Sequence, residues 1–227
     1  MADFPVFRQL LNATLDVDEA GLERRDGTVV GDKDIRLLLR ENRIALALGE
    51  VVLIPVTGYG DLDVVRYDIP LMCAVHSHPD CRFSWSRLMV DLSPTREARI
   101  IDMAPREVRG DKPIELKTSV GLDLKFESVA TVLKGEIGPK YEASRTVYYP
   151  EIVSSGLGLA RGYWDFLALT SDYLHANREL RMLVSAPAGS SVLVRFNLRA
   201  KVKLAGVPGL IPLLARHGEI DQTYRLA

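Results

Sequence analysis

The densest group of side chains that could bind a metal lies between Cys73 and Cys81. The segment reads Cys-Ala-Val-His-Ser-His-Pro-Asp-Cys and contains both cysteines of the chain. If it forms a strand, His76 and His78 project from the same face, and both imidazoles could reach one Zn²⁺ at about 2.0 Å. The cysteines do not have the Cys-x₂-Cys spacing of a structural zinc module. The alternative, which we favour, is a strand end with two surface histidines and two buried thiols, and it needs no cofactor.

The same segment resembles the signature of the JAMM metalloproteases, which reads His-Ser/Thr-His, then seven residues, Ser, two residues and Asp. Residues 76–78 match its beginning, Pro79 is also common there, and Ser86 stands at the position of the serine. The resemblance implies a metal-dependent hydrolase in which His76 and His78 are zinc ligands.

The chain departs from this signature at the acidic ligand. Met89 stands where the family has its aspartate, and the nearest carboxylate, Asp91, comes two residues later. The family places the serine and the aspartate on a helix, whereas residues 83–92 have the pattern of a strand. Glu50 is an upstream glutamate that could transfer a proton, and it lies in an apolar run.

A second group of candidate residues is aromatic. Tyr163 and Trp164, with Arg161 beside them, follow the Gly- and Ser-rich stretch 154–158. We expect this region to be a long connection between strands, with a short helix near residues 164–174. Aromatic and arginine side chains dominate interface hot spots, and loops usually carry recognition residues. Arg161, Tyr163 and Trp164 are therefore the candidate binding residues, with burial of the aromatics in the core as the alternative.

A third group is cationic and has a spacing of two. Near the C-terminal end of the chain, alternate positions of one predicted strand carry basic residues around Asn197, namely Arg195, Arg199, Lys201 and Lys203. Such a stripe could receive nucleic-acid phosphates or an acidic partner. The alternative is a solvated face balanced by Glu115 and Asp123 of another long strand.

The composition narrows the classes of protein that are possible. The chain has 227 residues, 47% of them hydrophobic and 26% charged, so a sizeable core can form. The net charge of −1 provides no overall field for attracting nucleic acid or an anionic membrane. Two cysteines are too few for a disulfide framework, and the sequence shows neither a secretory signal nor a long apolar helix. These features predict a cytoplasmic protein.

Two segments must supply much of the framework. Residues 114–126 and 192–204 each alternate apolar and polar side chains over thirteen positions. A period of two directs successive side chains to opposite faces of a sheet, so each segment is predicted to be a strand with one buried face. Shorter apolar runs, divided by Pro and Gly about every ten residues, lie between residues 44 and 204, which is typical of an all-β domain.

The fold class that follows is mainly β: an antiparallel two-layer β-sandwich over residues 44–227, with a small, partly helical appendage over residues 1–43. The helical expectation comes from the spacing of apolar residues in 4–12 and from the run 34–43. We also expect a β-hairpin in which strands 180–185 and 192–204 are joined by the turn 186–190.

Three functions remain open. The first is a non-enzymatic protein-interaction or assembly module, which binds another protein or a second copy of itself; sandwiches often serve in this way. The second is a zinc-dependent hydrolase using His76 and His78. The third is a β-hairpin pore-former or membrane-surface protein, because a strand of thirteen residues exceeds the 9 to 11 or so that cross a bilayer in a tilted barrel.

Overall fold

The computed structural model describes residues 7–19, 35, 39–54, 64–109, 114–119, 142–147, 150–168, 177–207, 209–215 and 222–227. Its strands, in chain order, are β1 (Arg8–Val17), β2 (Arg43–Leu48), β3 (Val52–Ile54), β4 (Val64–His76), β5 (Cys81–Asp91), β6 (Arg99–Ala104), β7 (Glu107–Arg109), β8 (Ile114–Ser119), β9 (Glu142–Val147), β10 (Pro150–Ser155), β11 (Arg161–Leu167), β12 (Asn177–Pro187), β13 (Leu193–Leu204), β14 (Ile211–Ala215) and β15 (Thr223–Arg225). The mainly β prediction is confirmed. Within these ranges no helix is long and apolar enough to span a membrane.

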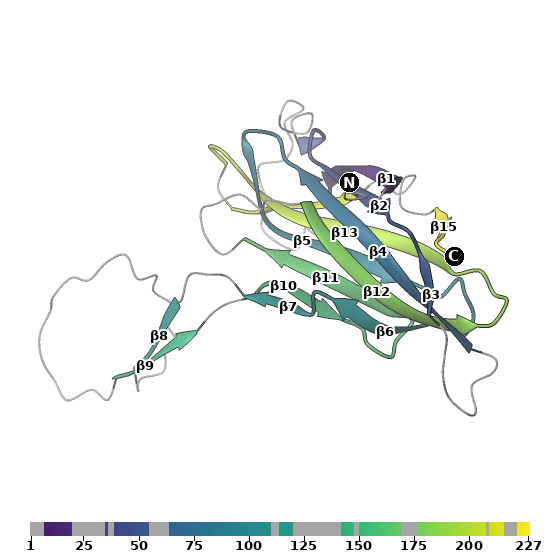
Figure 1. Ribbon diagram of the computed structural model, residues 1–227. Coiled ribbons are helices and arrows are strands. Elements are labelled where there is room, and N and C mark those ends of the chain that lie inside the picture. The colour runs from purple at the N-terminus through teal and green to yellow at the C-terminus, as the bar shows by residue number, and fades with distance from the viewer. Residues whose placement is uncertain are drawn as a thin grey trace, which may run out of the picture.

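Thirteen of the strands form one sheet, and its order is β6-β12-β4-β2-β1-β14-β13-β5-β11-β10-β7, with β3 beside β4 and β15 beside β13. The sheet curves round so that the side with β4 and β12 lies in front of the side with β5 and β13 (Figure 1). We call these two sides of the one curved sheet its layers. The turn into the second layer occurs along β1. Residues 8–14 of this strand pair with β2, whereas residues 15–17 pair with β14.

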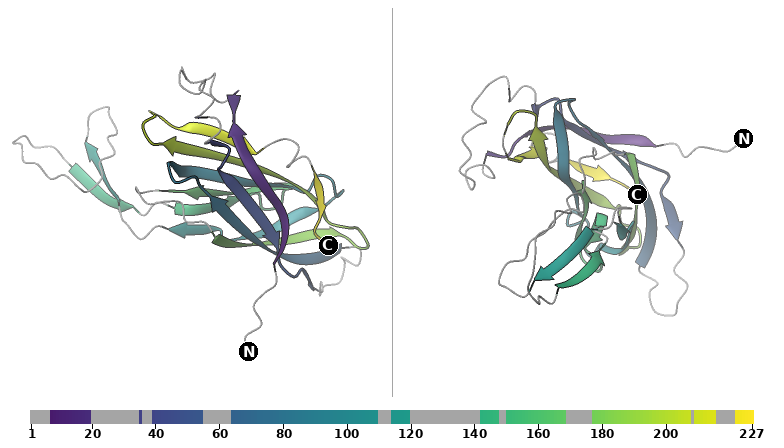
Figure 2. Two further views of the ribbon diagram at one scale, coloured as in Figure 1. Left: turned by 90° about the horizontal axis from the view of Figure 1, so that it is seen from above. Right: turned by 90° about the vertical axis from the view of Figure 1, so that its left-hand side faces the viewer.

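The other end of the strand order is also nearly closed. β6 and β7 are the two terminal strands, and only Pro105 and Arg106 separate them in the chain. β6 lies against β11 of the second layer at Gly162, where a Cβ would come 2.7 Å from Ile100 Cδ1 and 2.9 Å from Met103 Sδ. The fold is therefore a nearly closed, barrel-like sheet, and the predicted two-layer sandwich is correct only in its antiparallel β character (Figure 2).

The core lies between the two layers. Along β13, Val194, Phe196, Leu198, Ala200, Val202 and Leu204 are all buried and alternate with exposed or half-buried residues, as the sequence pattern predicts. The prediction for residues 114–126 is confirmed as strand over 114–119, and residues 120–126 lie outside the described ranges.

Three expectations about local structure are wrong: the N-terminal helix, the hairpin across residues 186–190 and the helix beginning near residue 164. The partly helical N-terminal portion is not seen in the described residues, because residues 8–12 belong to β1, where Leu11 and Ala13 face the core. Most of the run 34–43 lies outside the described ranges. Strand pairing with β2 and β14 decided a pattern that was ambiguous by itself.

The predicted hairpin across residues 186–190 is also absent. β12 pairs with β4 and β6, whereas β13 pairs with β5, β14 and β15, so the connection passes from one layer to the other. Residues 164–167, where a helix was expected to begin, are part of β11.

Candidate functional site

The segment with the two histidines forms the connection between β4 and β5. His76 is the last residue of β4 and is exposed, and His78 lies in the turn that follows. Because the strand ends between them, the premise that both imidazoles project from one strand face is wrong. The described residues contain no group of three or more His, Cys, Asp and Glu side chains that could hold a metal ion.

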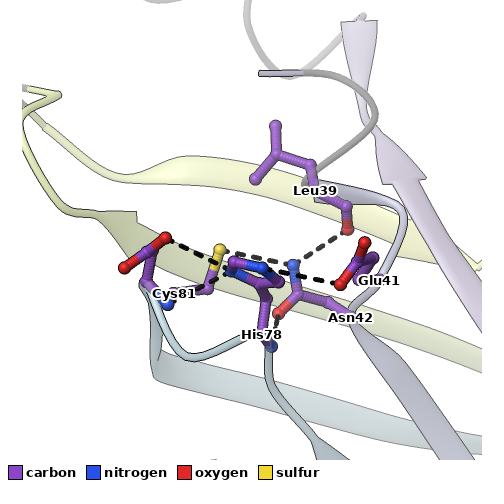
Figure 3. Close-up of polar contacts among 6 residues, drawn as sticks. Leu39, Glu41, Asn42, His78 and Cys81 are labelled. Carbon is purple, nitrogen blue, oxygen red and sulfur yellow. Dashed lines mark hydrogen bonds and ion pairs between the residues drawn. The ribbon is translucent and has the colours of Figure 1, made fainter. Parts of the chain in front are cut away.

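His78 instead belongs to a network around the buried side chain of Asn42 (Figure 3). Asn42 Nδ2 donates to the carbonyl of Leu39 at 2.9 Å and to Cys81 Sγ at 3.4 Å. Asn42 Oδ1 accepts a hydrogen bond from the backbone N–H of His78 at 3.0 Å. One amide thereby joins the chain before β2 to the β4–β5 turn, which explains its burial without a ligand.

The imidazole of His78 lies between two carboxylates. Its Nε2 is 3.5 Å from Glu41 Oε2, and its Nδ1 is 3.8 Å from Asp80 Oδ2. Nδ1 also accepts a hydrogen bond from the backbone N–H of Asp80 at 3.2 Å. These contacts hold the turn, and both imidazole nitrogens are directed toward residues near the turn.

The remaining residues of the JAMM-like pattern lie along β5. Ser86 is buried, and the strand that contains it is not the helix of that family. Asp91, at the far end of β5, lies ten residues from Cys81, a strand length of about 33 Å. Its carboxylate accepts from Arg161 Nε at 3.2 Å and from Ser93. The structure therefore does not bring the acidic residue to the histidines.

Both cysteines are free thiols enclosed in the core. Burial raises the pKa of Cys73 to about 12. Burial also raises the pKa of Cys81, against the opposing effect of the hydrogen bond from Asn42. A thiol with a raised pKa is a poor nucleophile and a poor metal ligand at neutral pH.

The three predicted binding residues lie on β11, not on a loop, and they do not share a face. Trp164 is completely buried, whereas Arg161 is exposed and Tyr163 is half-buried on the outer face. The alternation of a strand separates the tryptophan from its neighbours. The prediction of a common hot spot is wrong for Trp164, while Arg161 and Tyr163 remain on an accessible surface.

That surface consists of outward-facing positions on β11, β5 and β13, aligned in rows by the strand register. The rows are Arg161–Asp91–Arg195, Tyr163–Met89–Asn197, Asp165–Arg87–Arg199 and Leu167–Trp85–Lys201. We call these twelve residues the outer face. The sequence did not single out Trp85, Arg87 or Asp165, although their period-two spacing with Met89 and Tyr163 was a signal that could have found them.

Arg87 is at the centre of the outer face. Its Nε and Nη2 each donate to Asp165 at 2.7 Å, and its guanidinium lies 3.9 Å from the centroid of the Tyr163 ring and 5.4 Å from that of Trp85. The hydrogen bonds with Asp165 raise the pKa of Arg87, against the opposing effect of burial. Lys201 Nζ lies 5.3 Å from the Trp85 ring. Cations flank the tryptophan on both strands.

A separate element is the two-stranded sheet formed by β8 and β9, which pairs with none of the thirteen strands of the large sheet. Figure 1 shows this hairpin standing apart from the body of the molecule. Its register places Ile114, Leu116 and Thr118 opposite Val147, Arg145 and Ala143. The intervening positions pair Glu115 with Thr146, Lys117 with Ser144 and Ser119 with Glu142. One series is wholly polar, and the other is mostly apolar.

Comparisons with known proteins assign the chain to no family. No protein-family model matches it, and no curated protein matches it. Among solved structures, the Clostridium perfringens delta-toxin is 8% identical, with a TM-score of 0.37 over 99% of this chain and 89% of that one. The Clostridium perfringens NetB toxin, in its membrane-inserted form, is 9% identical, with a TM-score of 0.26 over 82% of each chain.

Proposed function

We propose that this protein assembles on a membrane and inserts its β8–β9 hairpin into the bilayer, which makes it a β-hairpin pore-former. The observation that supports this proposal is the β8–β9 hairpin. It is independent of the large sheet, and its register puts a polar and a mostly apolar series on alternate positions. The sequence extends the alternation of β8 to residue 126, a run of thirteen positions. Crossing a bilayer as a tilted β-strand takes about 9 to 11 residues.

Membrane insertion by a hairpin implies self-association. A single hairpin leaves two strand edges with unpaired N–H and C=O groups, which hydrocarbon cannot satisfy. Hairpins from several copies can close into a barrel, so that every backbone group is paired and the polar series lines the lumen. The expectation of an assembly module is thereby retained, with further copies of this chain as the partner.

The test is dye release from vesicles of phosphatidylcholine and phosphatidylserine. We expect the wild-type protein to release the dye and to form membrane-bound oligomers that chemical crosslinking detects. A Lys on a lipid-facing position costs up to about 2 to 4 kcal/mol per chain near the bilayer centre and less near its surface. The variant Leu116→Lys should therefore lower the release rate by about tenfold or more.

The matched control is Thr146→Lys, which adds the same charge to the polar series, opposite Glu115. It should release dye like the wild type. Both variants should keep the wild-type melting temperature, because the hairpin pairs with no strand of the large sheet. Absence of release by the wild type, or equal release by the two variants, would contradict the proposal.

A further inference from the structure

The outer face has more guanidinium groups than carboxylates. The row Asp165–Arg87–Arg199 contains one carboxylate and two arginines. Arg87 donates two hydrogen bonds to that carboxylate. In the row Arg161–Asp91–Arg195, the single carboxylate pairs with Arg161. In both rows the carboxylate is paired with an arginine that is not the one on β13. Arg195 and Arg199 make no ion pair among the described residues.

The strands on the other side of β13 do not compensate this charge. β14 and β15 have the sequences Ile-Pro-Leu-Leu-Ala and Thr-Tyr-Arg and contain no acidic residue. Asp16 of β1, beyond β14 in the sheet, is held by Arg40 at 2.8 Å. Arg195, Arg199 and Lys203 are all exposed. Glu115, which was expected to balance this stripe, lies on β8, and β8 is not part of the sheet. Asp123, the other expected partner, lies outside the described ranges.

A row with like charges on neighbouring strands is destabilising, and uncompensated local costs concentrate at functional sites. We propose that the exposed residues of β13, together with Trp85 of β5, form a docking surface for a bilayer of anionic phospholipids. Arg195, Arg199 and Lys203 contact headgroup phosphates, and Trp85 lies at the level of the headgroups. The inference rests on the membrane function proposed above, and names the surface that meets the bilayer before insertion.

The other residues of this face favour a bilayer over a nucleic acid. Trp85 is flanked by Arg87 and Lys201, and tryptophan with cations that extend toward water is characteristic of membrane interfaces. Beside the stripe, Leu214 and Pro212 stand opposite Arg199 and Lys201. A protein binds duplex DNA through polar contacts to phosphates and base edges, and Leu214 and Pro212 have no polar side-chain group for such contacts.

Vesicle co-sedimentation tests the docking surface without requiring a pore. The wild-type protein should bind vesicles that contain phosphatidylserine, bind pure phosphatidylcholine at least tenfold more weakly, and lose affinity as salt increases. The double variant Arg199→Glu with Lys203→Glu should bind the anionic vesicles at least tenfold more weakly, since each cation near such a surface contributes about fivefold.

Two controls separate docking from folding and from net charge. Arg109→Glu with Arg178→Glu reverses the same number of charges at exposed positions on β7 and β12, and it should bind like the wild type. The Arg199→Glu and Lys203→Glu variant should melt no lower than the wild type, because a glutamate at 199 stands opposite Arg87. A second measurement uses brominated lipids, which should quench the fluorescence of the wild type but not of Trp85→Phe.

The outcomes distinguish this inference from the proposed function. Binding by Leu116→Lys without dye release supports both the docking surface and the role of the hairpin. Vesicle binding by the wild-type protein without dye release would support the docking surface and contradict the pore-forming function. Equal binding by both double variants, equal binding to neutral and anionic vesicles, or preferential binding of duplex DNA would overturn the docking surface.

Discussion

Arg87 on β5 and Asp165 on β11 form a bidentate ion pair, with two N–O distances of 2.7 Å. The pair is partly buried, since the exposed fractions of the two side chains are 29% and 17%. Tyr163 lies beneath the guanidinium, and Trp85 is at its other side. This relationship fixes the centre of the outer face and determines which arginines remain available beside it.

Replacing Asp165 by Ala should lower the free energy of unfolding by about 1 to 2 kcal/mol, because it leaves a partly buried guanidinium without its charged partner. Urea denaturation measures the change. The control is Glu107→Ala, which removes an exposed pair with Arg109 and should cost under about 0.5 kcal/mol. Equal losses for the two variants would show that the geometry of the Arg87 pair adds nothing.

Trp164→Ala should lower the free energy of unfolding by about 3 to 5 kcal/mol through the cavity it leaves, because the side chain is fully enclosed. Trp164→Phe should cost clearly less. It keeps most of the ring volume and removes an indole N–H that has no hydrogen-bond partner among the described residues. A thermal melt paired with vesicle binding checks this, and a binding defect in a stably folded Trp164→Phe protein would contradict it.

Phe196→Ala should cost about 3 to 5 kcal/mol, since Phe196 is buried and its ring lies 5.8 Å from that of Tyr224. Its neighbour on β13, Arg195, faces outward and is the matched control: Arg195→Ala should change stability by under about 0.5 kcal/mol. Chemical denaturation of the two variants tests the alternation of the strand directly. Similar losses would mean that β13 is not amphipathic in solution.

Asn42→Ala should lower the free energy of unfolding by about 2 to 3 kcal/mol, because the N–H of His78 loses its acceptor in a buried network. The β4–β5 turn should then exchange its amide hydrogens faster, which hydrogen exchange detects. His78→Ala keeps the backbone N–H that Asn42 binds and should cost less. A larger loss for His78→Ala than for Asn42→Ala would assign the turn to the imidazole contacts instead.

The pH dependence of stability should include a contribution from Asp91. Burial raises the pKa of this carboxyl, but hydrogen bonds from Ser93 and Arg161 outweigh that effect and hold the pKa below its ordinary value. The folded state then binds fewer protons than the unfolded chain, so the contribution is full above about pH 5, where an unfolded aspartate is ionised. It is lost as the pH falls through the folded pKa.

Asp91→Asn is the corresponding variant. At pH 7 it should be less stable than the wild type by about 1 kcal/mol, and the two stability curves should converge in acid. Chemical denaturation at pH values between about 7 and 2 measures the free energy of unfolding of both proteins. A constant difference across this range would assign the effect to packing and not to ionisation.

The sequence by itself determined which face of β13 is buried. In β13 the alternation predicted every buried position from Val194 to Leu204, because a period of two allows only one assignment of faces when one side meets the core. The same reasoning located a strand at 114–119 and identified a hairpin-forming membrane protein as one of three open functions.

The tertiary structure decided what local pattern could not. The apolar residues near the N-terminus fit a helix or a strand, and only pairing of β1 with both β2 and β14 selected the strand and joined the two layers. His76 and His78 are separated because β4 ends between them, which depends on the turn held by Asn42. The outer face arises from three strands that are distant in the chain, and register is a property of the sheet, not of any one strand.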